Sequence, residues 1–436
     1  RVAGRLLRSW CLVLILLAGC GGRDVPEVGV DGGVDADASP EGGATIDIYP
    51  MTPELQGAFG STEYRLWVRP TGSPDSAYQE VPIFQDTVAK EGGPQATAVE
   101  PDLVSFAKLS ALGAVTYKVQ RLSGSMTNPN VVPGRFGIGV TRLGSDTVTF
   151  SVDSASNAYV MKDGSTLKTL YLELRFDENQ SLVTSAEVAG FDFQVAQNKK
   201  EKIRHPLFIF QLPLEVAPPR PTDANVYVIN PGDTSWRTFQ TAGNYALDLP
   251  PGKSIAYFSP GFHGFSLENG DEYAILLVPN DHSVYLAGGS YVQFAMAPAD
   301  GEVSNVGLYG RGILTHLASD QYTGSLGPRF VDPTPGTEFG PNAYSTGNRV
   351  LSNVWIDGIT FNWTMDAAVD SYGALKTTNV QIFGWTYNAD GLTMGKDSYT
   401  ADLFTMSFDD QVKAYFSGAY AERLLIWQSA SGAPIK

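Results

Sequence analysis

The chain has 436 residues, a formal net charge of −16, 46 glycines and 27 prolines, but only two cysteines. This length is sufficient for two or three domains, and the glycine and proline content is typical of a turn-rich all-β protein. Phosphate binding needs clustered lysine and arginine side chains, so the acidic balance excludes nucleic acid as a partner. A neutral polysaccharide is compatible with it.

The first 19 residues predict a bacterial signal peptide. Three arginines lie ahead of an apolar run, residues 10–17, which is too short for a permanent membrane helix. The run ends in Leu-Ala-Gly before Cys20, which resembles a lipobox. That resemblance implies lipidation of Cys20, membrane anchoring, and an exported lipoprotein on the outer membrane or cell surface. Because Cys11 leaves with the signal, we expect no disulfide and no thiol site.

The rest of the chain predicts a tether and two domains. Residues 20–44 are rich in Gly and Asp and poor in large apolar side chains, which is typical of a flexible acidic tether. Residues 45–214 contain short runs that alternate apolar and polar side chains, which predicts an antiparallel β-sandwich. Prolines within residues 213–221 mark the junction, and residues 222–436 form the second domain.

The second domain contains a repeat. The pattern Asn-Val-x-(Ile/Leu)-x-Gly occurs at residues 305–310, 353–358 and 379–384, and weaker copies begin at Asp402 and Glu422. The first interval is 48 residues, interpreted as two coils of 24, and the next is 26. Such a period predicts a right-handed parallel β-helix whose stacked coils share one core. The sequence lacks a first Met and stops inside an expected coil, so we expect an incomplete β-helix.

Three carboxylates near the end of the chain form a candidate site. Asp390 lies 19 positions before the adjacent pair Asp409 and Asp410. Residues about one coil apart lie at the strand spacing of roughly 4.7–4.9 Å, so Asp390 and Asp409 can face each other. Neighbours on a regular strand point to opposite faces, so Asp410 joins them only if the backbone bends. Crowded carboxylates separate into an acid and a base, as glycosidic hydrolysis requires. The alternative is an Asp-Gly turn and a solvated Asp-Asp corner.

This stretch resembles glycoside hydrolase family 49, the dextranase and isopullulanase family. The matching segments are WTYNADG at 385–391, DDQVK at 409–413, YFSG at 415–418 and IW at 426–427. The resemblance implies inverting hydrolysis of α-glucan linkages, either dextran-like α-1,6 or of the pullulan type. It implies Asp409 as general acid, with Asp390 and Asp410 as the bases that activate water. Ala389 replaces the family's usual Thr, which bears on specificity rather than on chemistry.

Further residues of the same stretch are candidates for binding the polysaccharide. Trp385 and Tyr387 alternate on one strand, so both form sugar platforms if that face is outward and core if it is inward. Lys413 follows the Asp pair closely enough to hold a carboxylate ionised. The substrate-binding candidates are Trp385, Tyr387, Asn388, Lys413, Tyr415 and Trp427.

Other functions are less well supported by the sequence. The four histidines form no His-x-x-x-His group, so no metal site or cofactor is predicted. A polygalacturonase-like hydrolase on the same fold is an alternative, but it expects Gly-His-Gly and Arg-Ile-Lys downstream, and no histidine follows His316. Another alternative is an anchored, glycan-binding β-helix without catalysis. We expect a monomer in each case.

Overall fold

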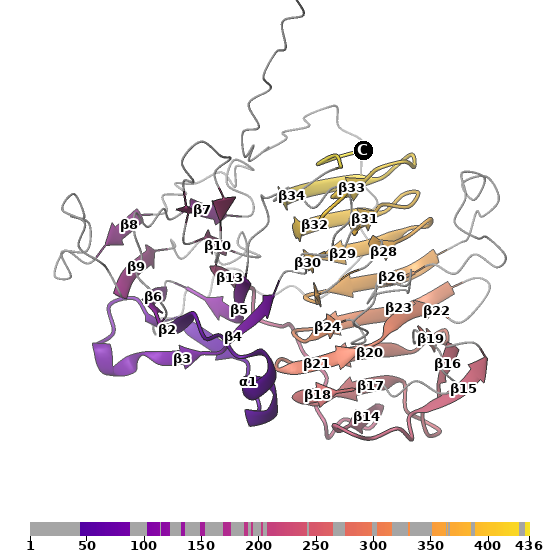
Figure 1. Cartoon of the computed structure of the whole chain (residues 1–436). Coiled ribbons are helices and arrows are strands. Elements are labelled where there is room, and N and C mark those ends of the chain that lie inside the picture. The colour runs from indigo at the N-terminus through magenta and orange to yellow at the C-terminus, as the bar shows by residue number, and fades with distance from the viewer. Residues whose placement is uncertain are drawn as a thin grey trace, which may run out of the picture.

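The computed structural model contains two kinds of β-structure side by side, a smaller group of sheets and a tall stack of strands (Figure 1). It describes residues 44–87, 103–113, 115–122, 132–135, 149–152, 169–175, 187–190, 193–194, 202–203, 207–241, 244–264, 275–298, 303–315, 330–331, 351–362, 364, 367–384, 389–426 and 432–436. The predicted signal peptide, Cys20 and the tether therefore lie outside the described residues. Within the described ranges, neither helix has the length and apolarity that a membrane span requires.

The described N-terminal strands form two main sheets and two strand pairs. The four-stranded sheet contains β1 (Thr45–Ile48), β4 (Ile83–Thr87), β5 (Leu103–Leu112) and β13 (Leu207–Leu212). The five-stranded sheet runs through β3 (Gln79–Val81), β2 (Tyr64–Pro70), β6 (Val115–Arg121), β9 (Thr169–Arg175) and β8 (Thr149–Val152). The pairs are β7 (Val132–Arg135) with β10 (Glu187–Gly190), and β11 (Phe193–Gln194) with β12 (Lys202–Ile203).

The two main sheets share a buried core, as predicted for a sandwich. Leu66 and Val68 of β2 are fully buried and belong to one cluster with Leu109 of β5 and Ile209 of β13. Strand β2 alternates buried and more exposed residues along its first half, which is the period of a half-buried strand. The pairings are antiparallel except between β5 and β13, which run parallel.

Among the described residues, two short helices accompany these sheets. The helix α1 (Pro53–Phe59) begins after Thr52, whose hydroxyl accepts a hydrogen bond from the backbone N–H of Leu55, and Pro53 fits its first position. Its buried Leu55 joins the cluster at the junction between the two kinds of β-structure. The second helix is a single 3₁₀ turn, η1 (Asp75–Ala77).

From Val226 onward the described strands build a parallel β-helix with three rows. The first row contains β14 (Val226–Ile229), β17 (Ile255–Phe258), β20 (Ser283–Leu286), β23 (Val303–Gly310), β26 (Leu351–Asp357), β29 (Leu375–Thr378), β32 (Tyr399–Met406) and β34 (Tyr420–Ile426). The second contains β18 (Gly261–His263), β21 (Ser290–Gln293), β24 (Ile313–Thr315), β27 (Thr360–Asn362) and β30 (Gln381–Phe383), and it joins the long strand β32. The third begins with β15 (Arg237–Thr241), which pairs antiparallel with β16 (Asn244–Leu247). From β16 it continues in parallel through β19 (Ile275–Val278), β22 (Ala295–Pro298), β25 (Phe330–Val331), β28 (Ala367–Asp370), β31 (Asp390–Thr393) and β33 (Val412–Lys413). The predicted class, all-β with a sandwich before a parallel β-helix, is confirmed.

The register corrects the interpretation of the 48-residue interval. Strand β23 pairs directly with β26, with Val306 opposite Val354. The first two copies of the repeat therefore lie on adjacent rungs, and the interval is one wide coil rather than two coils of 24. That coil also carries β24 and β25, and its remaining residues lie outside the described part of the chain.

The Asn of the repeat has a backbone role at one corner of the helix. Asn305, Asn353 and Asn379 adopt φ values of 55°, 54° and 56°, the left-handed conformation that Asn tolerates better than most residues. Asn353 also donates a side-chain hydrogen bond to Asn305 on the rung beside it, at 2.9 Å. Asp402 and Arg423 hold the same conformation and form an ion pair. The last weak copy therefore begins at Arg423, which takes the position of the Asn, rather than at Glu422.

The apolar positions of the repeat fill the interior. Val306, Leu308, Val354 and Ile356 are at most 2% exposed and belong to one continuous cluster along the stack. Full burial of such a side chain stabilises the fold by about 1.5–3 kcal/mol. The coils therefore stabilise one another through a shared core, as the repeat predicted.

The sandwich packs on the second row of the β-helix through aromatic side chains. Phe208 and Phe210 of β13 contact Phe404 of β32, with ring centroids 5.2 and 5.0 Å apart. Met406 belongs to the same buried cluster, and Phe408 packs against it. This contact lies immediately before the Asp pair in the sequence, so the sandwich supports the strand that leads into the candidate site.

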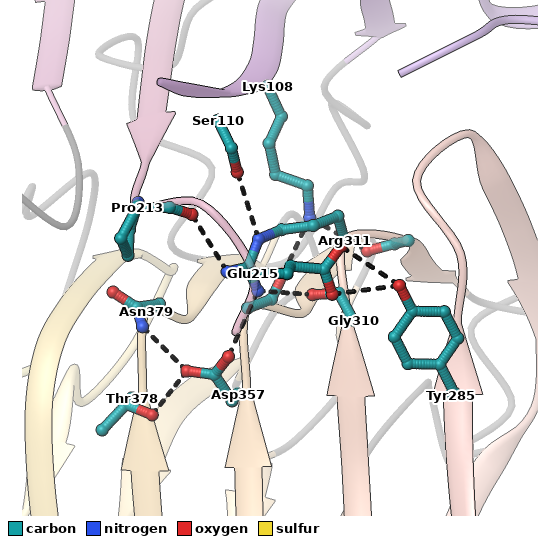
Figure 2. Close-up of polar contacts among 12 residues, drawn as sticks. Lys108, Ser110, Pro213, Glu215, Tyr285, Gly310, Arg311, Asp357, Thr378 and Asn379 are labelled. Carbon is teal, nitrogen blue, oxygen red and sulfur yellow. Dashed lines mark hydrogen bonds and ion pairs between the residues drawn. The ribbon is translucent and has the colours of Figure 1, made fainter. Parts of the chain in front are cut away.

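A buried polar network fixes the same junction (Figure 2). The ammonium group of Lys108, on β5, donates to the carbonyl oxygens of Gly312 and Gly358, both at 3.0 Å, and to the hydroxyl of Thr360 at 2.9 Å. Arg311 donates to the carbonyl oxygen of Pro213 at 3.2 Å, in the proline-rich segment. Burial lowers the pKa of Lys108 well below its usual value. Burial of this polar group is tolerated because two carbonyl oxygens and a hydroxyl oxygen lie within hydrogen-bond distance of its nitrogen.

Candidate active site

Strands β31 and β33 place the lone Asp against the Asp pair. Their parallel register sets Leu392 opposite Val412, which brings Asp390 across from Asp410. The backbone N–H of Asp410 donates to Oδ1 of Asp390 at 3.0 Å. The backbone N–H of Asp409 donates to the carbonyl oxygen of Ala389 at 2.9 Å. Adjacent rungs thus supply the acids, and Asp390 pairs most directly with the second member of the pair.

The three carboxylates converge. One oxygen from each of Asp390, Asp409 and Asp410 lies within 4.8 Å of the others. Asp390 and Asp410 are 4% and 5% exposed, whereas Asp409 is half-buried. The chain bends at Phe408 and Asp409, which is the condition that Asp410 needed to reach the same site. A solvated Asp-Asp corner does not describe this arrangement, since Asp410 is buried.

Two glycines make room for the site. A Cβ atom on Gly391 would lie 2.1 Å from the carbonyl oxygen of Gln411 on the next rung. A Cβ atom on Gly432 would lie 2.5 Å from Oδ1 of Asp409, and this glycine has φ of +85°. Gly391 lies within strand β31, so the alternative that Asp390-Gly391 forms a turn is wrong. Glycine is needed at position 391 because the backbone of β31 lies close to the backbone of the next rung at Gln411.

Two lysines neutralise two of the carboxylates. Lys413 forms a close ion pair with Oδ2 of Asp390 and lies 3.9 Å from Oδ2 of Asp410. Lys436 donates to the same oxygen of Asp410 at 2.8 Å, and the backbone N–H of Ala433 donates to its Oδ1 at 2.9 Å. Burial alone would raise the pKa of Asp410, but the hydrogen bonds from Lys436 and Ala433, with the two positive charges, outweigh it and lower that pKa.

The third carboxylate differs from these two. Within the described part of the chain, no lysine or arginine nitrogen lies within ion-pair distance of Asp409. Asp390 and Asp410 each contact an ammonium group, whereas Asp409 is more exposed and contacts none in that part of the chain. The ion pairs thus separate Asp409 from the other two carboxylates.

The carboxylates are also the described residues with the spacing to hold a metal ion. Oxygen ligands of this kind suit Ca²⁺ or Mg²⁺. Here the ammonium group of Lys413 already lies against Asp390 and close to Asp410. The lysines already supply positive charge to Asp390 and Asp410, so the residues fit acid–base chemistry better than metal binding.

The remaining site predictions divide into two groups. Lys413 lies at the carboxylates, with its pKa raised because contact with Asp390 outweighs the effect of burial, and Tyr415 is 40% exposed on the segment after β33. The others lie outside the described residues and stay predictions: Trp385, Tyr387, Asn388 and Trp427.

Sequence reasoning missed three residues of the site. Lys436 and Gly432 come from the rung after β33, and their contacts with the Asp pair span more than 20 positions. Gln411 stands inside the motif that carries the family resemblance, but it received no role. The signal in the sequence was a Gln directly after the Asp pair. Its full burial, which requires partners for the amide, is seen only in the structure.

Comparison with known proteins points to the family that the motif indicated. No protein-family model matches the chain. Among curated proteins, the chain is similar to a dextranase from Arthrobacter sp. (strain CB-8), with 24% identity over 198 residues. That match covers 42% of this chain and 30% of the dextranase, so it spans less than a third of the relative's length. The predicted resemblance to the dextranase family is confirmed at this low identity.

A solved structure has a similar fold. It is Dex49A from Penicillium minioluteum, with a TM-score of 0.56 and 17% identity. The match covers 89% of this chain and 72% of Dex49A. At this identity the likeness concerns the fold, and it extends over most of the sandwich and the β-helix together.

Proposed function

We propose that the protein is a glycoside hydrolase that cleaves α-glucan linkages through carboxylate acid–base chemistry. The observation that carries this proposal is the convergence of Asp390, Asp409 and Asp410 within 4.8 Å, with lysines on two of the three. The similarity to a dextranase supports the substrate class, and dextran-like α-1,6 linkages are the first choice.

We assign the roles from the ion pairs and from the family resemblance, which implies Asp409 as the acid. Asp409 donates its proton to the glycosidic oxygen as the bond from the anomeric carbon to that oxygen breaks. A water oxygen forms the new bond to the anomeric carbon, and its proton passes to Asp390 or Asp410. Lys413 and Lys436 keep these two bases ionised, which a base must be before it can accept a proton. After each turnover Asp409 takes up a proton from solvent, and the base releases to solvent the proton that it accepted.

The stereochemical course has two candidates. The family resemblance implies inversion, and we propose it as the mechanism. Inverting enzymes usually keep acid and base about 6.5–9.5 Å apart, whereas retaining enzymes keep them about 5–5.5 Å apart. Retention, with Asp390 or Asp410 as nucleophile, is the second candidate because one oxygen of each carboxylate lies within 4.8 Å of the others. NMR detection of the first anomer released from dextran decides between them.

The activity test is reducing-sugar release from dextran and pullulan by the full chain. Asp390→Asn is expected to lower turnover by about 100-fold or more, since it removes a base. The matched control is Asp402→Asn. Asp402 is also buried, but it holds the left-handed corner position that Asn occupies in other coils. Glycan binding without turnover by the wild-type protein would contradict the proposal and leave a non-catalytic β-helix.

The lipid anchor is a separate proposal. It rests on the Leu-Ala-Gly-Cys20 segment and its preceding apolar run. It places the enzyme on a membrane surface, with polysaccharide as its partner in the surrounding medium.

A further inference from the structure

The bend between β32 and β33 raises a structural problem. Asp409 and Asp410 are consecutive, yet both reach Asp390. A regular strand would send them to opposite faces. The segment from Ser407 to Gln411 must therefore leave the strand conformation and hold a defined shape while its neighbours remain in register.

Neighbouring rungs satisfy part of this segment. The N–H of Asp409 donates to Ala389 on the rung before, and the N–H of Gln411 donates to Ala433 on the rung after, both at 2.9 Å. The carbonyl oxygen of Asp410 accepts from Gly391 at 2.8 Å. These bonds fix where the segment starts and ends between the rungs, and they leave backbone groups of Ser407 and Asp409 to be paired elsewhere.

The side chain of Gln411 pairs those groups. Its Oε1 accepts from the N–H of Ser407 at 3.0 Å and from the hydroxyl of Thr405 at 3.0 Å. Its Nε2 donates to the carbonyl oxygen of Ser407 at 2.7 Å and to that of Asp409 at 2.8 Å. Both donors and both acceptor positions of the amide are used, and the residue is 0% exposed.

The side chain of Gln411 bridges the two ends of the bend. The amide makes a donor and an acceptor contact with the same residue, Ser407, as a paired strand would. The three residues between Ser407 and Gln411 are thereby forced out as a loop, and the bond to the carbonyl oxygen of Asp409 sets the orientation of that peptide. Gln411 itself reaches neither Asp390 nor the carboxylate of Asp409 in these bonds.

We propose that Gln411 is the positioning residue that holds Asp409 and Asp410 on one side of the chain. This inference rests on the proposed function for its consequence in catalysis, but its structural content stands on the four hydrogen bonds. Reacting groups must be held within a fraction of an ångström, and a displacement of about 1 Å costs about 100-fold in rate.

The test compares two buried glutamines in the full chain. Gln411→Met keeps the length of the side chain and removes all four hydrogen bonds. The control is Gln381→Met. Gln381 is also 0% exposed and hydrogen-bonded, to Thr360 and to the carbonyl oxygen of Asn379, none of which belongs to the site. If any loss of buried hydrogen bonds lowers kcat, both variants are affected. If the bonds of Gln411 across the bend are what matters, only Gln411→Met is affected.

Gln411→Met is expected to lower kcat on dextran about 100-fold with KM changed less than about threefold, and to alter the pH profile of kcat. Gln381→Met is expected to keep kcat within about threefold and to keep the profile. A crystal structure of Gln411→Met should show the carboxylate of Asp409 moved away from Asp390. An unmoved carboxylate, or equal kcat in the two variants, would overturn the inference.

Failure of the proposed function and failure of the role given to Gln411 can be distinguished. If the wild-type protein releases no sugar from any α-glucan, the proposed function fails, and the position of Asp409 in the variant structure still decides the role of Gln411. If Gln411→Met does not fold, Gln411→Glu replaces it, since it keeps the size and the acceptor but loses the Nε2 donors. A folded Gln411→Glu variant with wild-type kcat and pH profile would contradict the proposal.

Discussion

Lys413→Met is expected to destabilise the protein in a pH-dependent manner. Lys413 contacts Asp390 and lies 3.9 Å from Asp410, and its side chain is only 18% exposed. A charge pair at about 4 Å interacts with about 4 kcal/mol at an effective dielectric constant of about 20. Removing one partner of a buried pair costs about 3–5 kcal/mol. Because water reaches Lys413, we expect a loss of about 3 kcal/mol in the free energy of unfolding at pH 7.

The sign of the pH dependence follows from Asp410. Its pKa is lowered in the folded state, so its carboxylate contributes stability above about pH 4, which is lost as the pH falls through the folded value. Without Lys413 that pKa rises, and the buried carboxylates take up protons at higher pH. The destabilisation should therefore become smaller as the pH falls below about 4. The acidic limb of kcat against pH should move upward.

Urea unfolding at pH 7 and at about pH 3 measures the first effect, and the pH–rate profile measures the second. The control is Lys376→Met, which removes an exposed lysine of β29 in the same β-helix. Equal destabilisation of Lys413→Met at both pH values, with an acidic limb that does not move, would refute the electrostatic role given to Lys413.

Three further predictions test the site, the fold and the anchor. Gly432→Ala should lower kcat at least 10-fold because its Cβ would lie 2.5 Å from Asp409, whereas Gly252→Ala, with nearly the same φ but no atom within 4 Å, should show only the backbone strain of about 1 kcal/mol on thermal unfolding. Asn353→Ala should cost about 1–2 kcal/mol in urea unfolding because a left-handed residue loses its tolerated side chain and its ladder bond, and an unchanged midpoint would contradict this. Cys20→Ala should abolish incorporation of labelled fatty acid during bacterial expression, and persistent labelling would contradict the anchor.

The repeat determined much of the fold because its signals are local. The Val and Ile or Leu of each copy fill the core, and the Asn adopts the left-handed corner conformation, so each residue type has a direct backbone or packing cause. The interval between Asn305 and Asn353 was misinterpreted because a wide coil and two ordinary coils give the same spacing. Only strand register separates these possibilities, and register is a property of distant pairing.

The sequence predicted those contacts of the site that join residues about one coil apart. Asp390 and the Asp pair lie about one coil apart, so rung spacing brought them together. Lys436 was missed because its contact depends on the next rung, 26 positions from Asp410. Gln411 was missed because its role arises from a bend whose shape the sequence pattern does not specify. Local patterns identified the acids, but they did not identify Lys436, which pairs with Asp410, or Gln411, which shapes the bend that carries the Asp pair.

The most direct test of the central claim measures Asp409→Asn on two substrates. One is dextran, whose leaving group needs a proton, and the other is an aryl isomaltooligosaccharide, whose phenolate leaves without one. With Asp409 as the proton donor, turnover of dextran falls about 10²–10⁴-fold, while turnover of the aryl substrate falls less than about 10-fold. Equal losses on both substrates, or full activity on dextran, would contradict the assignment of the proton to Asp409.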